Sequence, residues 1–263
     1  MRLTVPQRLL LPLILALGLG IGLSRPLFSD PAPIQGSSEL AVLSTAIEGL
    51  AAQVADATVT LHVSLAGEGG GVINGEGSGF VVDAFAGLIV TNAHVVKDAK
   101  TVRVTFYDRR EELGKVLGVD KQTDLAVVKV APGSPRKQLN WGDSDRLRPG
   151  SLVMAVGSPL QLDGTTSLGV VSALHRKLNQ NPDSYEDFVQ FDAFIDRGSS
   201  GGPMVDMAGE VVGINTAIGA SGGSTAWSGI SYAVPSAIAQ RFCEDLAEFG
   251  KVRRGWMGIR VDR

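Results

Sequence analysis

Apolar residues follow two different periods along the chain, and the change of period separates a helix from a β-rich region. An apolar residue recurs at spacings of three and four near the N-terminal end, at Leu40, Leu43, Ile47, Leu50 and Val54. This spacing predicts one apolar stripe on a helix. We expect the stripe to pack on the domain that follows, and a contact between subunits is the alternative.

From residue 57 onward the apolar residues form short runs rich in β-branched side chains, which predict strands. The runs are ATVTLHVSL, GLIVTNAHVV, TVRVTFYD, DLAVVKV, SLVMAVGSP, TSLGVVSAL and DFVQFDAF. Residues 203–218 are interpreted as a hairpin that turns at Ala208 and Gly209, and residues 67–79 (GEGGGVINGEGSG) as a flexible loop. Many short strands with glycine between them indicate β-barrels or a β-sandwich.

A second helix is predicted from Ser236 to Phe249, because Pro235 precedes it and Gly250 follows it. Its expected apolar face consists of Ile238, Phe242, Leu246 and Phe249. Cys243 adjoins this face and is interpreted as a small core residue rather than a nucleophile.

The N-terminal end carries the pattern of an export segment. Residues 9–23 are uninterrupted apolar sequence after Arg2 and Arg8, and the run is shorter than the ~20 residues of a typical spanning helix. Because no A-x-A-like cleavage site follows, we expect residues 1–23 to be an uncleaved signal-anchor that leaves the rest of the chain exported. A cleaved signal peptide is the alternative. Residues 24–38, with three prolines and four serines, are expected to form an extended linker.

Composition narrows the range of functions. The formal net charge is −3 and 44% of residues are hydrophobic, which suffices for a core and gives no reason to expect nucleic acid as a partner. The 33 glycines suit the many turns of a β protein. With Cys243 as the only cysteine, no disulfide can form within the chain.

Candidate chemistry centres on DRGSSGGP, residues 196–203. A serine becomes a strong nucleophile only beside a base, which is itself oriented by an acid. It also needs backbone N–H groups aimed at the developing oxyanion, and a glycine-rich bend supplies these readily.

The three histidines are the candidate bases. His62 lies within a predicted strand and His175 in a loop, whereas His94 ends an apolar strand. Asp124 precedes another apolar strand and is the candidate acid. The order His, Asp, Ser along the chain is that of chymotrypsin-like enzymes. The three histidines lack the spacing of metal ligands, so we expect no metal and no cofactor.

Over residues 40–260 or so, the chain resembles the HtrA (Deg) family of trypsin-like serine proteases. The segments that carry the resemblance are GSGFVVDAFAGLIVTNAHVV, TDLAVVKV, VMAVGSPLQL, TTSLGVVSALHR, GSSGGP, VGINTAI and GISYAVP. RGWMGI, residues 254–259, resembles the junction at which family members continue into a PDZ domain. We therefore expect a trypsin-like domain over residues 39–258, and a stub over 259–263 in place of a complete PDZ domain.

The resemblance implies an all-β fold of two six-stranded antiparallel β-barrels, with an N-terminal and a C-terminal helix. It implies a catalytic triad of His94, Asp124 and Ser200, because the nucleophile precedes the Gly-Gly pair in G-x-S-G-G-P. The N–H groups of Gly198 and Ser200 would form the oxyanion hole. The substrate-binding residues implied by the resemblance are Phe194, Ile195, Ile214, Asn215 and Thr216.

Within the expected substrate site, Ile195 and Ile214 would favour aliphatic side chains, and Phe194 would narrow the pocket. Asp196 drawing a basic side chain is the alternative. The family resemblance also implies that residues 175–188 act as a sensing loop, and that Ser199 cannot form the ion pair on which zymogen activation depends in pancreatic-type relatives.

The implied function is an endopeptidase that cleaves unfolded, misfolded or regulatory proteins through an acyl-enzyme. It would work as a homotrimer on the periplasmic side of the inner membrane, or free in the periplasm if the N-terminal segment is cleaved. Because FDAFIDRGSSGGP departs from the common family sequence at this loop, a weakly active or inactive scaffold that holds unfolded polypeptide is the alternative.

Overall fold

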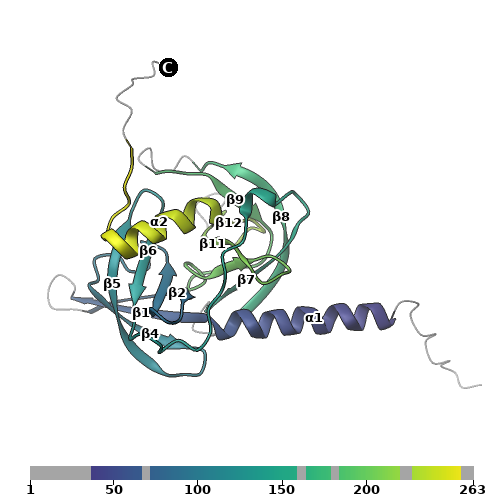
Figure 1. The fold of residues 1–263 in the computed structure, drawn as a ribbon. Helices are drawn as coiled ribbons and strands as arrows, with labels where there is room; N and C mark the ends of the chain where they lie inside the picture. The colour runs from purple at the N-terminus through teal and green to yellow at the C-terminus, as the bar shows by residue number, and fades with distance from the viewer. Residues whose placement is uncertain (1–36, 67–71, 159–163, 179–183, 220–226, 256–263) are drawn as a thin grey trace, which may run out of the picture.

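The computed structural model describes residues 37–66, 72–158, 164–178, 184–219 and 227–255. Two closed antiparallel barrels form the body of the protein (Figure 1). The first consists of β1 (Thr58–Ala66), β2 (Val72–Asp83), β3 (Leu88–Thr91), β4 (Thr101–Phe106), β5 (Glu111–Asp120) and β6 (Leu125–Lys129). The second consists of β7 (Leu152–Gly157), β8 (Thr165–Arg176), β9 (Phe188–Phe191), β10 (Pro203–Val205), β11 (Val211–Ile218) and β12 (Ser231–Pro235).

The two barrels share one topology. The strand order is β1-β2-β3-β6-β5-β4 in the first, and the corresponding order β7-β8-β9-β12-β11-β10 in the second. The expected pair of six-stranded barrels is thereby confirmed, and the sandwich alternative is excluded.

The region expected as a flexible loop, residues 67–79, is largely strand. β2 begins at Val72 and pairs with β1 from the register Ala66↔Val72 to Thr58↔Phe80, and residues 67–71 lie outside the described part of the chain. The glycines of β2 are required by close packing: a Cβ on Gly77 would lie 2.5 Å from a Val95 methyl group. Tertiary contacts here override the weak strand propensity of glycine.

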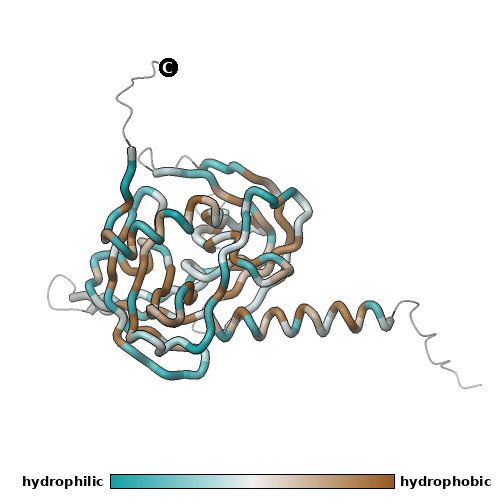
Figure 2. Tube along the Cα trace, in the orientation of Figure 1, coloured by the Kyte–Doolittle hydropathy of each residue, from teal (hydrophilic) through white to brown (hydrophobic). Residues whose placement is uncertain are grey.

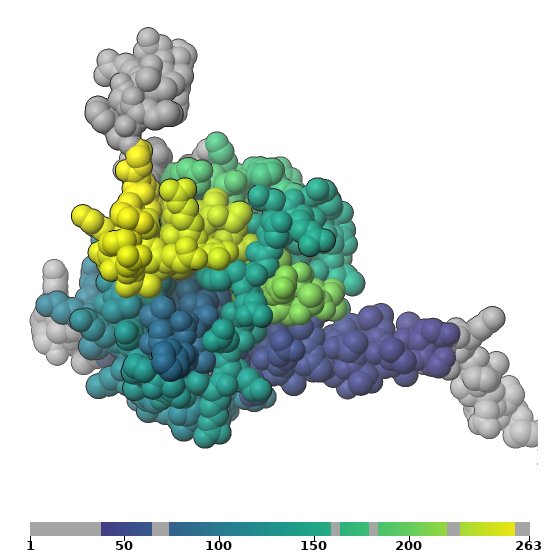
Figure 3. Space-filling model, in the orientation of Figure 1, coloured from purple at the N-terminus to yellow at the C-terminus, as the bar shows by residue number. Residues whose placement is uncertain are grey.

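The N-terminal helix α1 (Ser37–Asp56) is only half covered. Leu50 and Val54 are 8% and 0% exposed, whereas Leu40 and Leu43, on the same stripe, are 57% and 49% exposed. Figures 1 and 3 show the N-terminal part of the helix projecting away from the barrels, and Figure 2 shows that apolar residues continue along the projecting part. The expected packing on the following domain is therefore confirmed for the C-terminal half of the stripe.

The C-terminal helix α2 (Ser236–Phe249) has the bounds predicted from the sequence and ends at Gly250, whose φ of 71° is left-handed. Its buried face differs from the prediction: Ala239, Cys243 and Leu246 are buried, while Phe249 is 40% exposed. Phe249 lies instead beneath the Arg253 guanidinium, 3.8 Å from the ring centroid. Burial raises the pKa of the Cys243 thiol, which fits the core role expected for this cysteine.

Each terminal helix reaches the barrel that is farther from it in sequence. α1 precedes the first barrel but packs on β7 and β8 of the second as well as on β1. α2 follows the second barrel but packs on β5 and β6 of the first as well as on β11 and β12. The two helices therefore fasten the barrels to each other.

A continuous apolar core joins the barrels. It includes Phe80, Val90 and Leu125 from the first barrel, and Met154 and Ile214 from the second. This core brings the end of β3 and the start of β6 against the loop that precedes β10, which is where the candidate chemistry lies.

The export segment expected at residues 1–23 and most of the linker expected at 24–38 lie outside the described residues. The stub expected at residues 259–263 also lies outside them. Within the described ranges, no helix is both long and apolar enough to cross a membrane.

Candidate active site

His94 and Asp124 form a hydrogen-bonded pair at the edge of the first barrel. His94 Nδ1 lies 2.7 Å from Asp124 Oδ2, and the His94 backbone N–H donates to Asp124 Oδ1 at 2.9 Å. An ionised carboxylate can only accept hydrogen bonds, so the ring proton lies on Nδ1. The other ring nitrogen, Nε2, is then left as a proton acceptor, as a general base requires.

The backbone around Asp124 is fixed from the same side. Asp124 adopts a left-handed conformation with φ of 58°. Its carbonyl accepts the N–H of Ala93 at 3.1 Å and the side-chain amide of Asn92 at 2.9 Å. The segment that carries His94 is thus bonded to the Asp124 backbone as well as to its carboxylate, which fixes the position of the acid relative to the base.

Thr216, on β11 of the second barrel, connects this pair to Ser200. Its hydroxyl donates to Asp124 Oδ2 at 2.7 Å, and its carbonyl accepts the Ser200 hydroxyl at 3.4 Å. The structure therefore brings His94, Asp124 and Ser200 to one place, across both barrels. In this conformation the hydrogen bond of Ser200 Oγ goes to Thr216 and not to the imidazole.

The two glycines after Ser200 are required by close contacts, those of Gly201 with the first barrel and that of Gly202 with β7 of the second. Gly201 has a φ of 85°, and a Cβ there would lie 2.3 Å from the Ser78 carbonyl oxygen and from Thr91 Oγ1. A Cβ on Gly202 would lie 2.2 Å from the Val156 carbonyl oxygen. Any larger residue would push the nucleophile loop away from His94.

The loop before Ser200 presents two amides that suit an oxyanion hole. Gly198 has a φ of 96°, and the Ser199 N–H donates to the Asp196 carbonyl at 2.8 Å, which closes a tight turn. Among the hydrogen bonds of the described residues, none uses the N–H of Gly198 or of Ser200 as donor. These two groups are therefore available to a developing negative charge.

The five expected substrate-binding residues differ in how far their side chains are exposed to solvent. Thr216, 9% exposed, borders the site through its bonds to Ser200 and Asp124, and Phe194 is 39% exposed. Ile214 and Asn215 are 0% exposed, and Ile195 is 3% exposed. Ile214 belongs to the core between the barrels and Ile195 to the core of the second barrel.

The expectation that Ile195 and Ile214 line an open pocket is corrected by this burial. Residues Val211 to Thr216 of β11 are all buried, and Ile214 packs into the core between the barrels. Asn215 is also internal, because its amide donates to the carbonyls of Val156 and Pro203. The carboxylate of Asp196 accepts the N–H of its neighbour Arg197 at 2.7 Å, so it serves the backbone of its own turn.

Sequence reasoning missed two features of the site. Trp227 packs edge-on against Phe194, with ring centroids 5.3 Å apart, and donates its indole N–H to Ser231 Oγ at 3.0 Å. Thr216, expected only as a substrate contact, supports the acid through its hydroxyl. Neither role has a local sequence signal, because each depends on a segment that is distant along the chain.

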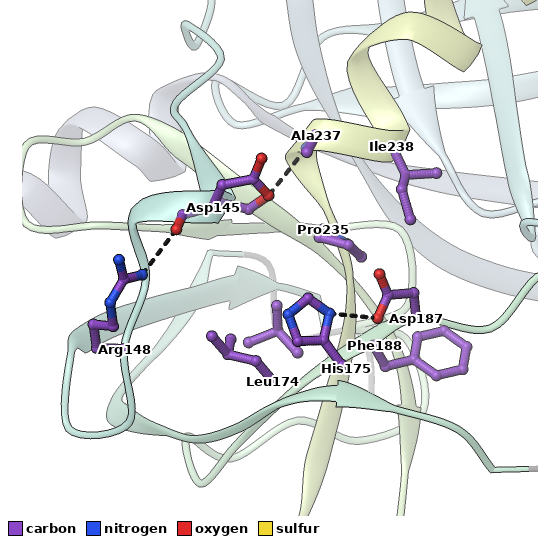
Figure 4. Close-up of a pocket in the computed structure, with 11 residues that line it drawn as sticks. Asp145, Arg148, Leu174, His175, Asp187, Phe188, Pro235, Ala237 and Ile238 are labelled. Atoms are coloured by element: carbon purple, nitrogen blue, oxygen red, sulfur yellow. Dashed lines mark hydrogen bonds and ion pairs between the residues drawn. The ribbon is translucent and has the colours of Figure 1, made fainter.

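The remaining histidines lie elsewhere. His62 pairs with Glu76 across β1 and β2 at 3.5 Å. His175 lies in β8, one residue before its end, rather than in a loop, and pairs with Asp187 at 2.9 Å. Figure 4 shows this pair on the wall of a cavity that lies between the end of β8, the start of β9 and the start of α2. The volume of this cavity is about 380 Å³. None of the expected catalytic residues lines that cavity, and the described residues contain no cluster of three possible metal ligands.

Two closed six-stranded barrels, with a histidine and an aspartate from one and a serine loop from the other, define a trypsin-like peptidase domain. A family profile described as "Trypsin-like peptidase domain" matches residues 77–214. A solved structure of the HtrA-type protease AlgW with tripeptide is 35% identical in sequence to this chain and matches its fold with a TM-score of 0.74. The match covers 82% of this chain and 68% of the AlgW chain. The chain belongs to the HtrA family of trypsin-like serine proteases.

Curated relatives agree with this family. The probable periplasmic serine protease do/HhoA-like of Haemophilus influenzae is 41% identical over 186 residues, which are 71% of this chain and 40% of the relative. The periplasmic pH-dependent serine endoprotease DegQ of Escherichia coli gives the same identity and the same two coverages. The aligned part of this chain thus spans about two fifths of the length of these relatives.

Proposed function

We propose that this protein is a serine endopeptidase that cleaves unfolded, misfolded or regulatory proteins outside the cytoplasm. The observation that carries the proposal is the 2.7 Å hydrogen bond between His94 Nδ1 and Asp124 Oδ2. This bond gives the imidazole the tautomer of a general base, and Thr216 ties the pair to the serine loop.

In the proposed reaction, Ser200 Oγ turns from the Thr216 carbonyl towards His94 Nε2 and attacks the scissile carbonyl carbon. His94 takes the hydroxyl proton as the new C–O bond forms, and Asp124 stabilises the imidazolium. His94 then gives the proton to the leaving amine as the C–N bond breaks, which leaves an acyl-enzyme on Ser200. A water molecule, deprotonated by His94, releases the acyl group in the second half of the reaction.

Negative charge develops on the former carbonyl oxygen during both halves of the reaction. The N–H groups of Gly198 and Ser200 would receive it, because they are adjacent donors on one tight loop with no other acceptor among the described residues. Removing one such donor typically lowers kcat about 10²–10³-fold, so their orientation sets much of the rate.

The substrate class, location and assembly are further parts of the proposal. Relatives described as periplasmic serine proteases support action in the periplasm. We place residues 1–23 as the membrane anchor, with a cleaved signal peptide as the alternative. The exposed apolar half of α1, which includes Leu40 and Leu43, supports self-association, and we propose a homotrimer as its form.

One observation favours a second candidate function, that of a scaffold which binds unfolded polypeptide without cutting it. Ser200 Oγ donates to the Thr216 carbonyl instead of to the imidazole, which is a resting arrangement. Because catalytic hydrogen bonds are often loose before substrate binds, we rank this function second.

A fluorophosphonate probe and a peptide-library digest separate the two candidates. We expect the purified protein to be labelled at Ser200 and to cleave library peptides, while Ser200→Ala loses both properties. Ser64→Ala is the matched control, because Ser64 lies on β1 away from the site and bonds to the Asn74 side chain. A wild-type protein that is neither labelled nor active would contradict the endopeptidase and favour the scaffold.

A further inference from the structure

Ser78, on β2 of the first barrel, makes several contacts with the nucleophile loop of the second barrel. The residue is 0% exposed. Its hydroxyl donates to the Gly198 carbonyl at 2.5 Å, and its backbone N–H donates to the Ser200 carbonyl at 2.8 Å. A single residue of one barrel thus holds two carbonyl groups on the loop of the other.

The peptide held by the Ser78 hydroxyl lies between the two candidate oxyanion donors. Gly198 N–H is on one side of the Gly198–Ser199 peptide, and Ser200 N–H is on the other. The N–H of this middle peptide donates to the Asp196 carbonyl at 2.8 Å. Because a peptide unit is planar, fixing its C=O and its N–H fixes the plane, and with it the torsion angles that aim both flanking amides.

This peptide needs to be held in place from outside the loop. Gly198 has a φ of 96°, a region in which glycine moves without steric penalty. Among the hydrogen bonds of the described residues, the one to the Gly198 carbonyl comes from the Ser78 hydroxyl. Without it, this carbonyl has no partner to oppose rotation of the peptide.

Ser78 is itself fixed by two further contacts, one through its hydroxyl and one through its carbonyl. Its hydroxyl oxygen accepts the Ser158 N–H, from the end of β7, at 2.9 Å. The Ser78 carbonyl accepts the Thr91 hydroxyl, from β3, at 2.7 Å. Ser78 is therefore bonded to β3 and to the residue that follows β7, both outside the loop, and it can resist movement of the loop rather than follow it.

We propose that Ser78 is a positioning residue for the oxyanion hole, acting through the Gly198 carbonyl on the N–H groups of Gly198 and Ser200. The catalytic part of this inference rests on the proposed endopeptidase function. Its structural part is that the hydroxyl orders the Gly198–Ser199 peptide. Hydrogen exchange can measure this order even in a protein that has no peptidase activity.

Ser236 provides a matched control. It is 1% exposed, donates its hydroxyl to the Gly142 carbonyl at 2.7 Å, and accepts the Ser144 N–H at 3.1 Å. These are the kinds of bonds that Ser78 makes with its hydroxyl, at the start of α2. Replacing either serine by alanine removes one hydrogen bond to a carbonyl and one from a backbone N–H, but of these two serines only Ser78 contacts the nucleophile loop.

The test compares Ser78→Ala, Ser236→Ala and the wild-type full chain. For Ser78→Ala we expect kcat to fall by about tenfold to a hundredfold, less than the loss of a whole oxyanion donor. KM should not change, because the oxyanion exists only in the transition state. Hydrogen exchange at the Ser199 N–H should become about fivefold to tenfold faster. Ser236→Ala should keep the wild-type kcat and Ser199 exchange.

The outcomes separate this inference from the proposed function. A Ser78→Ala protein with wild-type kcat and wild-type Ser199 exchange overturns the inference and leaves the endopeptidase intact. An inactive, unlabelled wild type whose Ser199 exchange still rises in Ser78→Ala overturns the endopeptidase and supports the ordering role. Equal kcat losses in both alanine variants would mean a general loss of stability, and would also overturn the inference.

Ser78→Cys covers the case in which Ser78→Ala does not fold. The thiol keeps a polar hydrogen beside Gly198 but is a weak donor, and its larger sulfur lengthens the contact with the Gly198 carbonyl, so the hold on Gly198 weakens. We expect its kcat to fall below that of wild type, with KM unchanged. A Ser78→Cys protein with full kcat would contradict the role of the hydroxyl hydrogen bond.

Discussion

At the scale of single residues, the candidate site depends on hydrogen bonds that fix direction. Asp124 is the clearest case, because its carboxylate accepts from the His94 ring, the His94 N–H and the Thr216 hydroxyl. Three donors from two barrels leave the carboxylate little freedom. Its function is therefore to select one tautomer and one orientation of the imidazole.

Asp124→Asn tests this role. The amide can present an N–H towards His94 Nδ1, which stabilises the tautomer that carries its proton on Nε2 and cannot act as a base. We expect kcat to fall about 10⁴-fold, with little change in stability, as measured by peptide cleavage and thermal unfolding. Glu76→Gln, beside His62 on β1 and β2, is the control and should keep its activity. A decrease of less than tenfold in Asp124→Asn would argue against the triad.

At the scale of elements, the sequence predicted which helices and strands are present better than it predicted what each of them packs against. The bounds of α2 and the turn between β10 and β11 follow from local signals, namely Pro235, Gly250 and Gly209. The strand at residues 72–79 could not be predicted, because pairing with β1 and close packing explain its glycines. Burial of Ile195 and Ile214 likewise depends on how each barrel closes, which no local pattern encodes.

The same distinction applies to the candidate site. Motif order located His94, Asp124 and the serine loop, because each lies at the end of a recognisable strand or bend. The hydroxyls of Ser78 and Thr216 were not found, since their partners are 120 and 92 residues away. A contact between barrels can be seen only once the barrels are docked.

The projecting half of α1 leads to a prediction at this scale. Because Leu40 and Leu43 are exposed to water, this half of the helix gains little stability from burial and is marginally stable by itself. Association with other copies of the chain would cover these apolar side chains. We expect the wild-type full chain to sediment as a trimer in detergent, and Leu43→Asp to shift it to monomer. Thr45→Asp adds the same charge to another exposed face of the helix and should stay trimeric. A monomeric wild type, or a trimeric Leu43→Asp, would contradict this mode of assembly.

At the scale of the whole molecule, the segment after α2 is bonded to the turn that leads to Asp124. Arg254 donates to both carboxylate oxygens of Asp120, at 2.9 and 2.6 Å. Asp120 also accepts the backbone N–H and the hydroxyl of Thr123. From the second barrel, Tyr185 N–H donates to the Gln122 carbonyl in the same turn at 2.7 Å. The turn before the acid is thus held by two segments that are distant from it in sequence, the one after α2 and the one before β9.

This arrangement predicts a pH-dependent contribution to stability. Burial raises the pKa of the Asp120 carboxyl, but hydrogen bonds from Arg254 and Thr123 outweigh burial and lower the pKa below its ordinary value. A lowered folded-state pKa gives stability that is present above the unfolded value of about 3.9 and is lost as pH falls through the folded value.

Arg254→Gln should therefore be less stable than wild type by about 1.5–3 kcal/mol at pH 7, and the difference should shrink as pH falls below about 4. Urea unfolding at pH 7 and at pH 3 measures both values. Arg136→Gln, which removes a 74% exposed side chain 3.5 Å from Asp108, should change stability by less than about 1 kcal/mol at either pH. A difference for Arg254→Gln that is constant with pH would exclude Asp120 as its source.

The reach of each terminal helix to the sequence-distant barrel has a consequence for how the enzyme can be divided. Each sheet closes on itself, so a cut in the connection between β6 and β7 leaves both closures intact. One fragment would carry the imidazole and its acid, and the other the nucleophile. Neither fragment could react alone. Packing of α1 on the second barrel and of α2 on the first would rejoin the fragments and bring all three catalytic side chains together again. Activity in such a divided chain would report re-association of the fragments directly.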